Sequence, residues 1–363
     1  MTDMTGLYIH VPFCAQKCPY CDFFSGQYSK NRTEAYLDAV CRNLETMPQG
    51  LDVDTIYFGG GTPSLLTPAQ IAQILEKAAS RCTLHAPEIT LEANPRTLTD
   101  ERLSGYLRCG VNRLSIGVQS FEDETLQILG RRHSAEQAKD AVVRAKSVGF
   151  TNISIDLMLG LQSHTAEYLQ RQLDIALALP ITHLSVYLLK IEDGTPFAAS
   201  PPAMLSEDDM VERYLQMHEY LESAGFSHYE ISNFAKEGYE SRHNCKYWRC
   251  EPYFGIGPAA HSCYGGKRFA VPRNLDAFCT APTQPTEITD EAPCGDAERI
   301  MLGLRLKEGI APDDYPTISA QIRKNAAPLI PKFVQEKQNR LALTAEGFLV
   351  SNAVITTILR GIL

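Results

Sequence analysis

The chain has 363 residues, of which 44% are hydrophobic, and its 34 basic and 43 acidic residues give a formal net charge of −9. This composition can supply a large buried core, and the negative charge speaks against a nucleic-acid partner. Residues 1–13 contain no basic segment followed by an apolar run, and no run of about 18 apolar residues occurs anywhere, so neither export nor a membrane span is expected. We therefore expect a cytoplasmic protein, for which peripheral contact with a membrane stays open.

Six short segments rich in β-branched and aromatic residues predict strands, and segments of helical pattern lie between them. The predicted strands cover residues 7–11, 54–60, 88–94, 112–120, 152–160 and 182–189. Thr67 precedes a proline at a helix start, and Ser134 with Gln137 forms a capping box for a helix that Gly149 should end. This alternation predicts an α/β fold with a parallel sheet and crossover helices.

Polar or glycine-rich residues follow each predicted strand. The sequence GGGTP follows the second, and Glu92, Gln119, Asp156 and Tyr187 lie at the ends of the third to sixth. In a barrel of βα units these ends converge at one mouth, whereas an open sheet forms its site at one switch point. The pattern therefore favours a partial (βα)6 barrel, similar to a TIM barrel, over an open Rossmann-like sheet.

The last part of the chain has a different pattern. Proline-rich sequence around residues 280–295 suggests a domain boundary, and from residue 296 the order is helix, helix, short strands, helix. This order is similar to a winged-helix domain, but its acidic and basic residues nearly balance, so protein contact is favoured over DNA binding. We expect a barrel over residues 1–235, a motif region and connector over 236–285, and a small winged-helix-like α+β domain over 286–363.

Three cysteines lie close together after the first predicted strand. Cys14, Cys18 and Cys21 have the spacing C-x3-C-x2-C. A disulfide would use two of these cysteines and leave the third unpaired. A structural zinc site usually takes its ligands from two separated pairs, and this segment could supply only one such pair. A [4Fe-4S] cluster held by three thiolates fits better and leaves one iron open to a small molecule. Zinc is the alternative.

This spacing resembles the signature of the radical S-adenosylmethionine (SAM) proteins, in which the amino and carboxylate groups of SAM chelate the open iron. The resemblance assigns Gly60, Gly61 and Thr62 to the methionine amino end and Arg131 to the carboxylate. The ordinary alternatives are a tight turn for the glycines and a solvated surface position for the arginine.

The remaining parts of SAM need suitable partners as well. Gln119 and Asp156, at strand ends, can accept hydrogen bonds from ribose hydroxyls, and Glu92 is an anion beside a cationic cofactor. Tyr8 and Tyr20 match positions that line the cofactor in the relatives, although core packing is the usual role of a single aromatic residue.

The order of several motifs is similar to the family of oxygen-independent coproporphyrinogen-III oxidase. These are YIHVPFCAQKCPYCDF, GGGTP, LEANP, SIGVQSF, LGRRH, DLMLGL and FGIGPAAHS. In the oxidase a fourth cysteine follows the third, but here that position is Phe23, which cannot bind iron. Whether this chain is an enzyme is therefore an open question, and the oxidase reaction is doubtful.

The segment RHNCKYW contains H-N-x-x-Y-W, which resembles the haem-binding motif of the haem-chaperone branch of that family. The resemblance implies that His243 binds haem iron and that Tyr247 and Trp248 contact the porphyrin. For a single histidine such as His243, a structural role is the simpler interpretation. A zinc site that includes Cys245, Cys250 and His261 would lack a recognised spacing.

The sequence thus predicts a haem chaperone that binds haem, a [4Fe-4S] cluster and SAM and passes haem to acceptor proteins, among which respiratory enzymes are candidates. The alternative is a radical SAM enzyme acting on a porphyrin, such as the oxidase itself. The oligomeric state is open between monomer and dimer.

Overall fold

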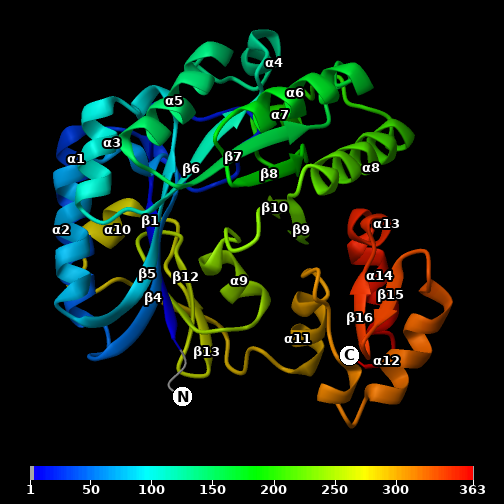
Figure 1. Cartoon of the computed structure of the whole chain (residues 1–363). Coiled ribbons are helices and arrows are strands. Elements are labelled where there is room, and N and C mark those ends of the chain that lie inside the picture. The colour runs from blue at the N-terminus through cyan, green and yellow to red at the C-terminus, as the bar shows by residue number, and fades with distance from the viewer. Residues whose placement is uncertain (1–3, 363) are drawn as a thin grey trace.

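A computed structural model describes residues 4–362 of the chain. Its main feature is a 12-stranded sheet in the order β14-β13-β12-β11-β1-β4-β5-β6-β7-β8-β10-β9 (Figure 1). A second sheet pairs β15 with β16, and a third pairs the two-residue strands β2 (Phe13–Cys14) and β3 (Gly26–Gln27). The sheet is mixed, with a parallel centre and antiparallel edges.

The parallel centre confirms the six predicted βα units. Its strands are β1 (Thr5–Val11), β4 (Leu51–Gly60), β5 (Cys82–Ala93), β6 (Arg113–Gln119), β7 (Asn152–Leu159) and β8 (His183–Leu188). In the order given, each of these strands up to β7 pairs in parallel with the following one. The strands carry fully buried apolar residues such as Leu7, Ile9, Phe58, Leu91 and Ile116, and these form one continuous core with the helices.

The helices that accompany these strands are α1 (Lys30–Thr46), α2 (Pro68–Ala79), α3 (Asp100–Arg108), α4 (Asp123–Ile128), α5 (Ala135–Val148), α6 (Ala166–Ala178), α7 (Pro196–Ala199) and α8 (Glu207–Ser223). The caps predicted at Thr67, Ser134 and Gly149 are confirmed. Capping boxes join Thr67 to Gln70 at α2 and Ser134 to Gln137 at α5. Gly149 ends α5 with a φ of 121°, a conformation that glycine adopts without strain.

Residues between 227 and 290 extend the sheet at both edges. At one edge β10 (Asn233–Ala235) and β9 (Ser227–Glu230) follow β8, antiparallel. At the other edge β11 (Tyr253–Ile256) pairs in parallel with β1. The antiparallel strands β12 (His261–Tyr264), β13 (Lys267–Ala270) and β14 (Glu287–Asp290) follow it. The sheet therefore continues well beyond the six units that the sequence predicted.

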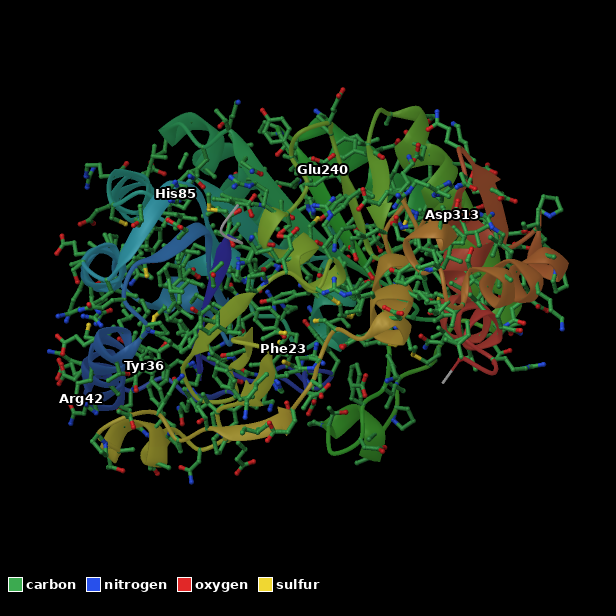
Figure 2. The ribbon with its side chains drawn as sticks, turned by 90° about the horizontal axis from the view of Figure 1, so that it is seen from below. Phe23, Tyr36, Arg42, His85, Glu240 and Asp313 are labelled. Carbon is green, nitrogen blue, oxygen red and sulfur yellow. The ribbon has the colours of Figure 1, made fainter. Side chains whose placement is uncertain are left out.

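The helix α9 (Arg242–Trp248) lies between this sheet and the C-terminal elements, and it contacts both β4 and α11 (Figure 1). The C-terminal elements are α11 (Asp296–Gly303), α12 (Ser319–Ala326), β15 (Val334–Lys337), β16 (Arg340–Leu343), α13 (Ala345–Leu349) and α14 (Ser351–Ile358). The short helix α10 (Leu275–Thr280) packs on α1 instead. Arg42 of α1 and Asp313 of the C-terminal segment lie toward opposite ends of the molecule (Figure 2).

None of the helices in residues 4–362 is long and apolar enough to cross a membrane.

Candidate functional site

The three cysteines lie in the loop that follows β1. All three thiols are free and half-buried, and the backbone N–H of Cys21 donates to the carbonyl of Cys18 over 3.2 Å. Two side chains from other βα units reach them: the Thr62 hydroxyl lies 3.5 Å from the Cys14 sulfur, and Nη1 of Arg131 lies 3.6 Å from the Cys18 sulfur. Both are donors, which suits sulfurs that carry negative charge as thiolates.

The number of thiols in this loop bears on what they could hold. Three thiolates would complete the protein ligands of a [4Fe-4S] cluster with one open iron, whereas a structural zinc ion would need a fourth ligand. Burial raises the pKa of Cys21, so cluster binding must overcome that cost of forming the thiolate.

The glycines of GGGTP lie against the same loop. A Cβ on Gly61 would come within 2.6 Å of the Phe13 carbonyl oxygen, and one on Gly60, whose φ is 108°, within 2.6 Å of the His10 ring. The backbone N–H groups of Gly60, Gly61 and Thr62 already donate to Glu92, Val11 and Phe13. These three donors are therefore engaged within the protein.

Two half-buried carboxylates face the interior of the barrel. Glu92, in β5, accepts from the Tyr57 hydroxyl at 2.8 Å and from the Gly60 N–H at 3.1 Å. Asp156, in β7, accepts from the Ser115 hydroxyl at 3.4 Å. Burial raises the pKa of Glu92 to about 7 and that of Asp156 to about 6. A cation placed between the two carboxyl groups would favour their ionised forms, and SAM carries a positive charge.

Arg113, which the sequence analysis missed, lies near these acids. It is only 2% exposed, and its positive charge acts to lower the pKa of both Glu92 and Asp156. Its Nε has no hydrogen-bond partner among residues 4–362. An arginine at the start of a predicted strand, in NRLSIGVQS, was the available signal, because a charged residue in a buried strand needs a partner inside.

Arg131 is held by two contacts at the mouth of the barrel. Its Nη2 donates to the Gly117 carbonyl at 2.6 Å and its Nη1 lies 3.6 Å from the Cys18 sulfur, while its buried Nε has no partner in the part of the chain that the structure describes. The preceding residue, Gly130, packs so closely on Pro19 that a Cβ would fall 2.5 Å from the ring. This contact positions Arg131 beside the cysteine loop, so it is not a solvated surface arginine.

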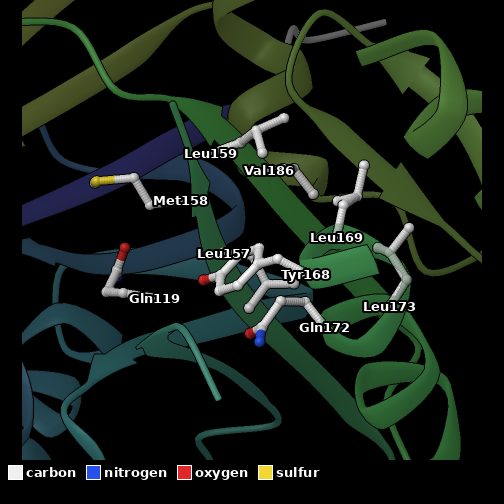
Figure 3. A pocket seen from close by; sticks show the side chains of 9 residues that line it. All are labelled: Gln119, Leu157, Met158, Leu159, Tyr168, Leu169, Gln172, Leu173 and Val186. Atoms are coloured by element: carbon white, nitrogen blue, oxygen red, sulfur yellow. The ribbon is translucent and has the colours of Figure 1, made fainter. Parts of the chain in front are cut away.

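Gln119 ends β6 in a left-handed conformation, with a φ of 68°. Figure 3 shows it at the edge of a cavity that also borders β7 and α6. This cavity has a volume of about 10 Å³, which is enough for a single water molecule but not for a nucleoside. A contact between Gln119 and a ribose would have to form on the side toward the barrel interior.

The two tyrosines have different surroundings. Tyr8 hydrogen-bonds through its hydroxyl to Nδ1 of His10 at 3.1 Å, inside the barrel. Tyr20 packs against Phe197, with ring centroids 6.4 Å apart, next to Cys18. Burial raises the pKa of both phenols, so both stay neutral. Tyr20 is thus part of the cluster loop, and Tyr8 lies further inside.

His243, in α9, is fully buried below the strand ends. Its Nδ1 lies 2.8 Å from the Thr55 hydroxyl and its Nε2 lies 2.9 Å from the Tyr247 hydroxyl. Its ring stacks on Tyr57 at 5.1 Å. Burial lowers the pKa of His243 to about 3, so the ring is neutral. Ligation of haem iron would require one of these two hydrogen bonds to open.

The predicted residues thus fall into two groups. The three cysteines, the glycine turn and the residues Thr62, Glu92, Gln119, Arg131 and Asp156 gather at the carboxyl ends of the strands. His243 and Tyr247 lie deeper, and Tyr57, another residue that the sequence analysis missed, connects the groups by contacting both His243 and Glu92.

Comparisons with known proteins identify relatives of this chain. The radical SAM superfamily model matches residues 8–175. Heme chaperone HemW of Escherichia coli (strain K12) is 43% identical over 261 residues, which cover 70% of this chain and 69% of that protein. Heme chaperone HemW of Lactococcus lactis is 33% identical over 361 residues, covering 96% and 95%. The mouse mitochondrial radical S-adenosyl methionine domain-containing protein 1 is 41% identical over 266 residues, covering 70% and 60%.

The fold also matches a solved structure. Coproporphyrinogen III oxidase from Escherichia coli, described as a radical SAM enzyme, superposes with a TM-score of 0.82 over 98% of this chain and 90% of that one, at 22% sequence identity. At that identity the match establishes the fold alone. On the strength of its curated relatives, the chain belongs to the HemW family of radical SAM proteins.

Proposed function

We propose that this protein is a haem chaperone, which binds haem and a [4Fe-4S] cluster with SAM and transfers the haem to acceptor haemoproteins. The observation that carries this proposal is identity of 33–43% to proteins named Heme chaperone HemW, in one case over 96% of the chain. The acceptors, for which respiratory enzymes are candidates, and action in the cytoplasm are part of the proposal.

The site residues support the binding of cluster and SAM. Cys14, Cys18 and Cys21 would hold the cluster, and Arg131 would bind the SAM carboxylate with its donors beside Cys18. The carbonyls of the glycine turn would accept from the SAM ammonium, and Glu92 would balance its charge. When bound, this pair of cofactors supplies one-electron chemistry.

His243 would bind haem iron through Nε2, the nitrogen that now bonds to the Tyr247 hydroxyl. The neutral state of the ring supports this role, because only a neutral imidazole can ligate a metal. Because His243 and Tyr247 both lie in α9, the exchange of Tyr247 for iron would require the Tyr247 side chain to turn away from Nε2.

The proposal is tested by anaerobic reconstitution, followed by haem titration with and without SAM and by transfer to an apo-haemoprotein. Wild-type protein should bind haem and deliver it. His243→Ala should lose the haem absorption band, whereas His85→Ala, which removes a half-exposed histidine paired with Asp52, should keep it. Tyr247→Phe keeps the aromatic ring but frees Nε2, so it should bind haem at least as tightly as wild type. Failure of the wild-type protein to bind haem would exclude the chaperone function.

A second candidate is a radical SAM enzyme acting on a porphyrin. The radical SAM match over residues 8–175 supports it, and Phe23, which is 67% exposed in the position of the fourth cysteine, opposes the oxidase reaction itself (Figure 2). Reduced protein incubated with SAM and coproporphyrinogen should form 5′-deoxyadenosine and consume the porphyrinogen if it is such an enzyme. Equal yields from wild type and Cys14→Ala would exclude it.

The domain boundaries of the chain are also part of the proposal. We propose that residues 286–363 form a winged-helix-like domain that contacts the acceptor, with residues 236–285 as the region that carries the haem motif. From α11 onward the order is helix, helix, hairpin and two further helices, which supports the comparison, whereas β14 at the start of the segment pairs with β13 of the large sheet.

A further inference from the structure

A cavity of about 150 Å³ lies where the end of α9 meets the C-terminal elements. Trp248 and Arg249 line it from α9 and its end, Arg299 from α11, and Tyr315 and Arg340 from the chain that follows. None of the residues proposed for cluster or SAM binding lines this cavity. It is a separate place on the molecule, built from two segments distant in sequence.

Three guanidinium groups converge on this cavity, together with the acids Glu308 and Asp314. Arg249 is already paired, because its Nε lies 3.1 Å from Glu308. Arg340 donates to the backbone carbonyls of Glu308 and Gly309 at 2.8 and 2.7 Å. The three cations and two acids leave the lining with a net positive charge.

Arg299 differs from the other two arginines. Its Nε donates to the Cys294 carbonyl at 2.8 Å, and it forms no ion pair with any carboxylate in the described residues. The side chain is exposed, so its terminal nitrogens are accessible. A guanidinium with two free parallel donors matches a carboxylate, which it can bind through two hydrogen bonds.

We propose that this cavity binds a propionate carboxylate of haem, with Arg299 as its principal donor, an inference that rests on the proposed chaperone function. Haem is a flat apolar ring with two carboxylates along one edge. The cavity is too small for the whole ring and large enough for a carboxylate edge. Trp248 offers an aromatic surface beside the arginines, and aromatic side chains pack well against porphyrins.

This site is independent of the iron ligand. His243 faces Thr55 and Tyr57 of β4, whereas Trp248 faces the C-terminal segment, where the Arg305 guanidinium lies 5.6 Å from its ring. The carboxylate site can therefore be tested without knowing which side chain ligates the iron.

The test compares haem with haem dimethyl ester, which has the same ring and iron but no carboxylates. Both are titrated into full-length reconstituted protein, wild type and Arg299→Gln, and occupancy is followed by haem absorbance and by quenching of Trp248, the only tryptophan. Because a charge-assisted hydrogen bond contributes about 1.5–3 kcal/mol, Arg299→Gln should weaken haem binding about tenfold or more. The same variant should leave the affinity for the ester unchanged.

Arg144→Gln is the matched control, since Arg144 is an exposed arginine of α5, far in sequence from the cavity, with only a long contact of 3.9 Å to Asp140. It should bind both compounds as wild type does. Arg299→Lys, which keeps the charge without the paired donors, should fall between wild type and Arg299→Gln.

The outcomes separate the two proposals. If wild type binds haem and the ester equally well, or if Arg299→Gln weakens both to the same extent, the carboxylate site is wrong while the chaperone function stands. If wild type binds neither compound, the chaperone function itself is wrong and the inference falls with it.

Discussion

Tyr57 and Glu92 form a hydrogen-bonded pair inside the barrel: the phenol donates to Oε1 of the carboxylate at 2.8 Å. The Tyr57 ring also stacks on the ring of His243. One tyrosine therefore touches both the acid proposed to face SAM and the histidine proposed to bind haem. The Glu92 carboxylate and the helix α9, which carries His243, are therefore linked through Tyr57.

The affinity for SAM should depend on pH through Glu92. Its pKa is about 7 without a ligand, because burial favours the neutral acid. A cationic ligand favours the anion, so affinity should rise as pH increases from about 6 to 8. Equilibrium dialysis with labelled SAM would measure this.

The Glu92→Gln variant should bind SAM weakly at all pH values, with a much flatter pH profile. Tyr57→Phe should move the profile to higher pH, because the lost hydrogen bond stabilised the anion. An unchanged profile in Glu92→Gln would show that another group is responsible.

Replacement of His243 by alanine should destabilise the fold by about 2–4 kcal/mol, since it leaves a cavity and removes the partners of Thr55 and Tyr247. Urea unfolding monitored by circular dichroism would measure the change. His85→Ala should change the unfolding free energy by less than about 1 kcal/mol, because that side chain is half-exposed. Similar losses in both variants would contradict the packing described for α9.

The pKa of about 3 for His243 also predicts how its contribution depends on pH. The folded protein holds this histidine neutral, whereas the unfolded chain protonates it below its ordinary pKa near 6.5. The unfolded state therefore binds more protons between these values, and stability should fall as pH is lowered through this range. Part of that slope should be missing in His243→Phe, as measured by urea unfolding at pH 7 and pH 5.

Gly61→Ala should impair the cluster loop. The new methyl would lie 2.6 Å from the Phe13 carbonyl oxygen, so the backbone beside Cys14 would have to shift. We expect a loss of about 1–3 kcal/mol in stability and a clear drop in iron bound per chain after reconstitution. Gly26→Ala, at a site with no atom within 4 Å of the new Cβ, should behave as wild type. Full iron content in Gly61→Ala would argue against this close approach.

Each of Cys14, Cys18 and Cys21 should be required for the cluster. Serine at any of these positions should abolish the broad visible absorption and most of the bound iron, because a hydroxyl is a poor replacement for a thiolate. Cys109→Ser, in a half-buried cysteine that donates to the Tyr106 carbonyl, serves as the control and should keep both. Iron retained in two of the three loop variants would indicate other ligands.

The sequence by itself determined the six βα units and the cysteine loop. Their signals are local: strand periodicity, the cap at Thr67 before a proline, the capping box at Ser134, and the spacing of three cysteines within eight residues. Glu92 and Asp156 could also be placed, since parallel strands that follow one another bring their carboxyl ends to one edge.

Only the tertiary structure decided which residues meet across the barrel. The bond between Thr55 and His243 joins residues 188 positions apart, and the pairing of β11 with β1 adds a strand from much later in the chain to one end of the sheet's parallel part. The strand β11 is four residues long and contains a glycine, so its local pattern is weak. Burial of Arg113 and His243, and the cavity beside Trp248, likewise arise from packing between distant segments, which no local periodicity encodes.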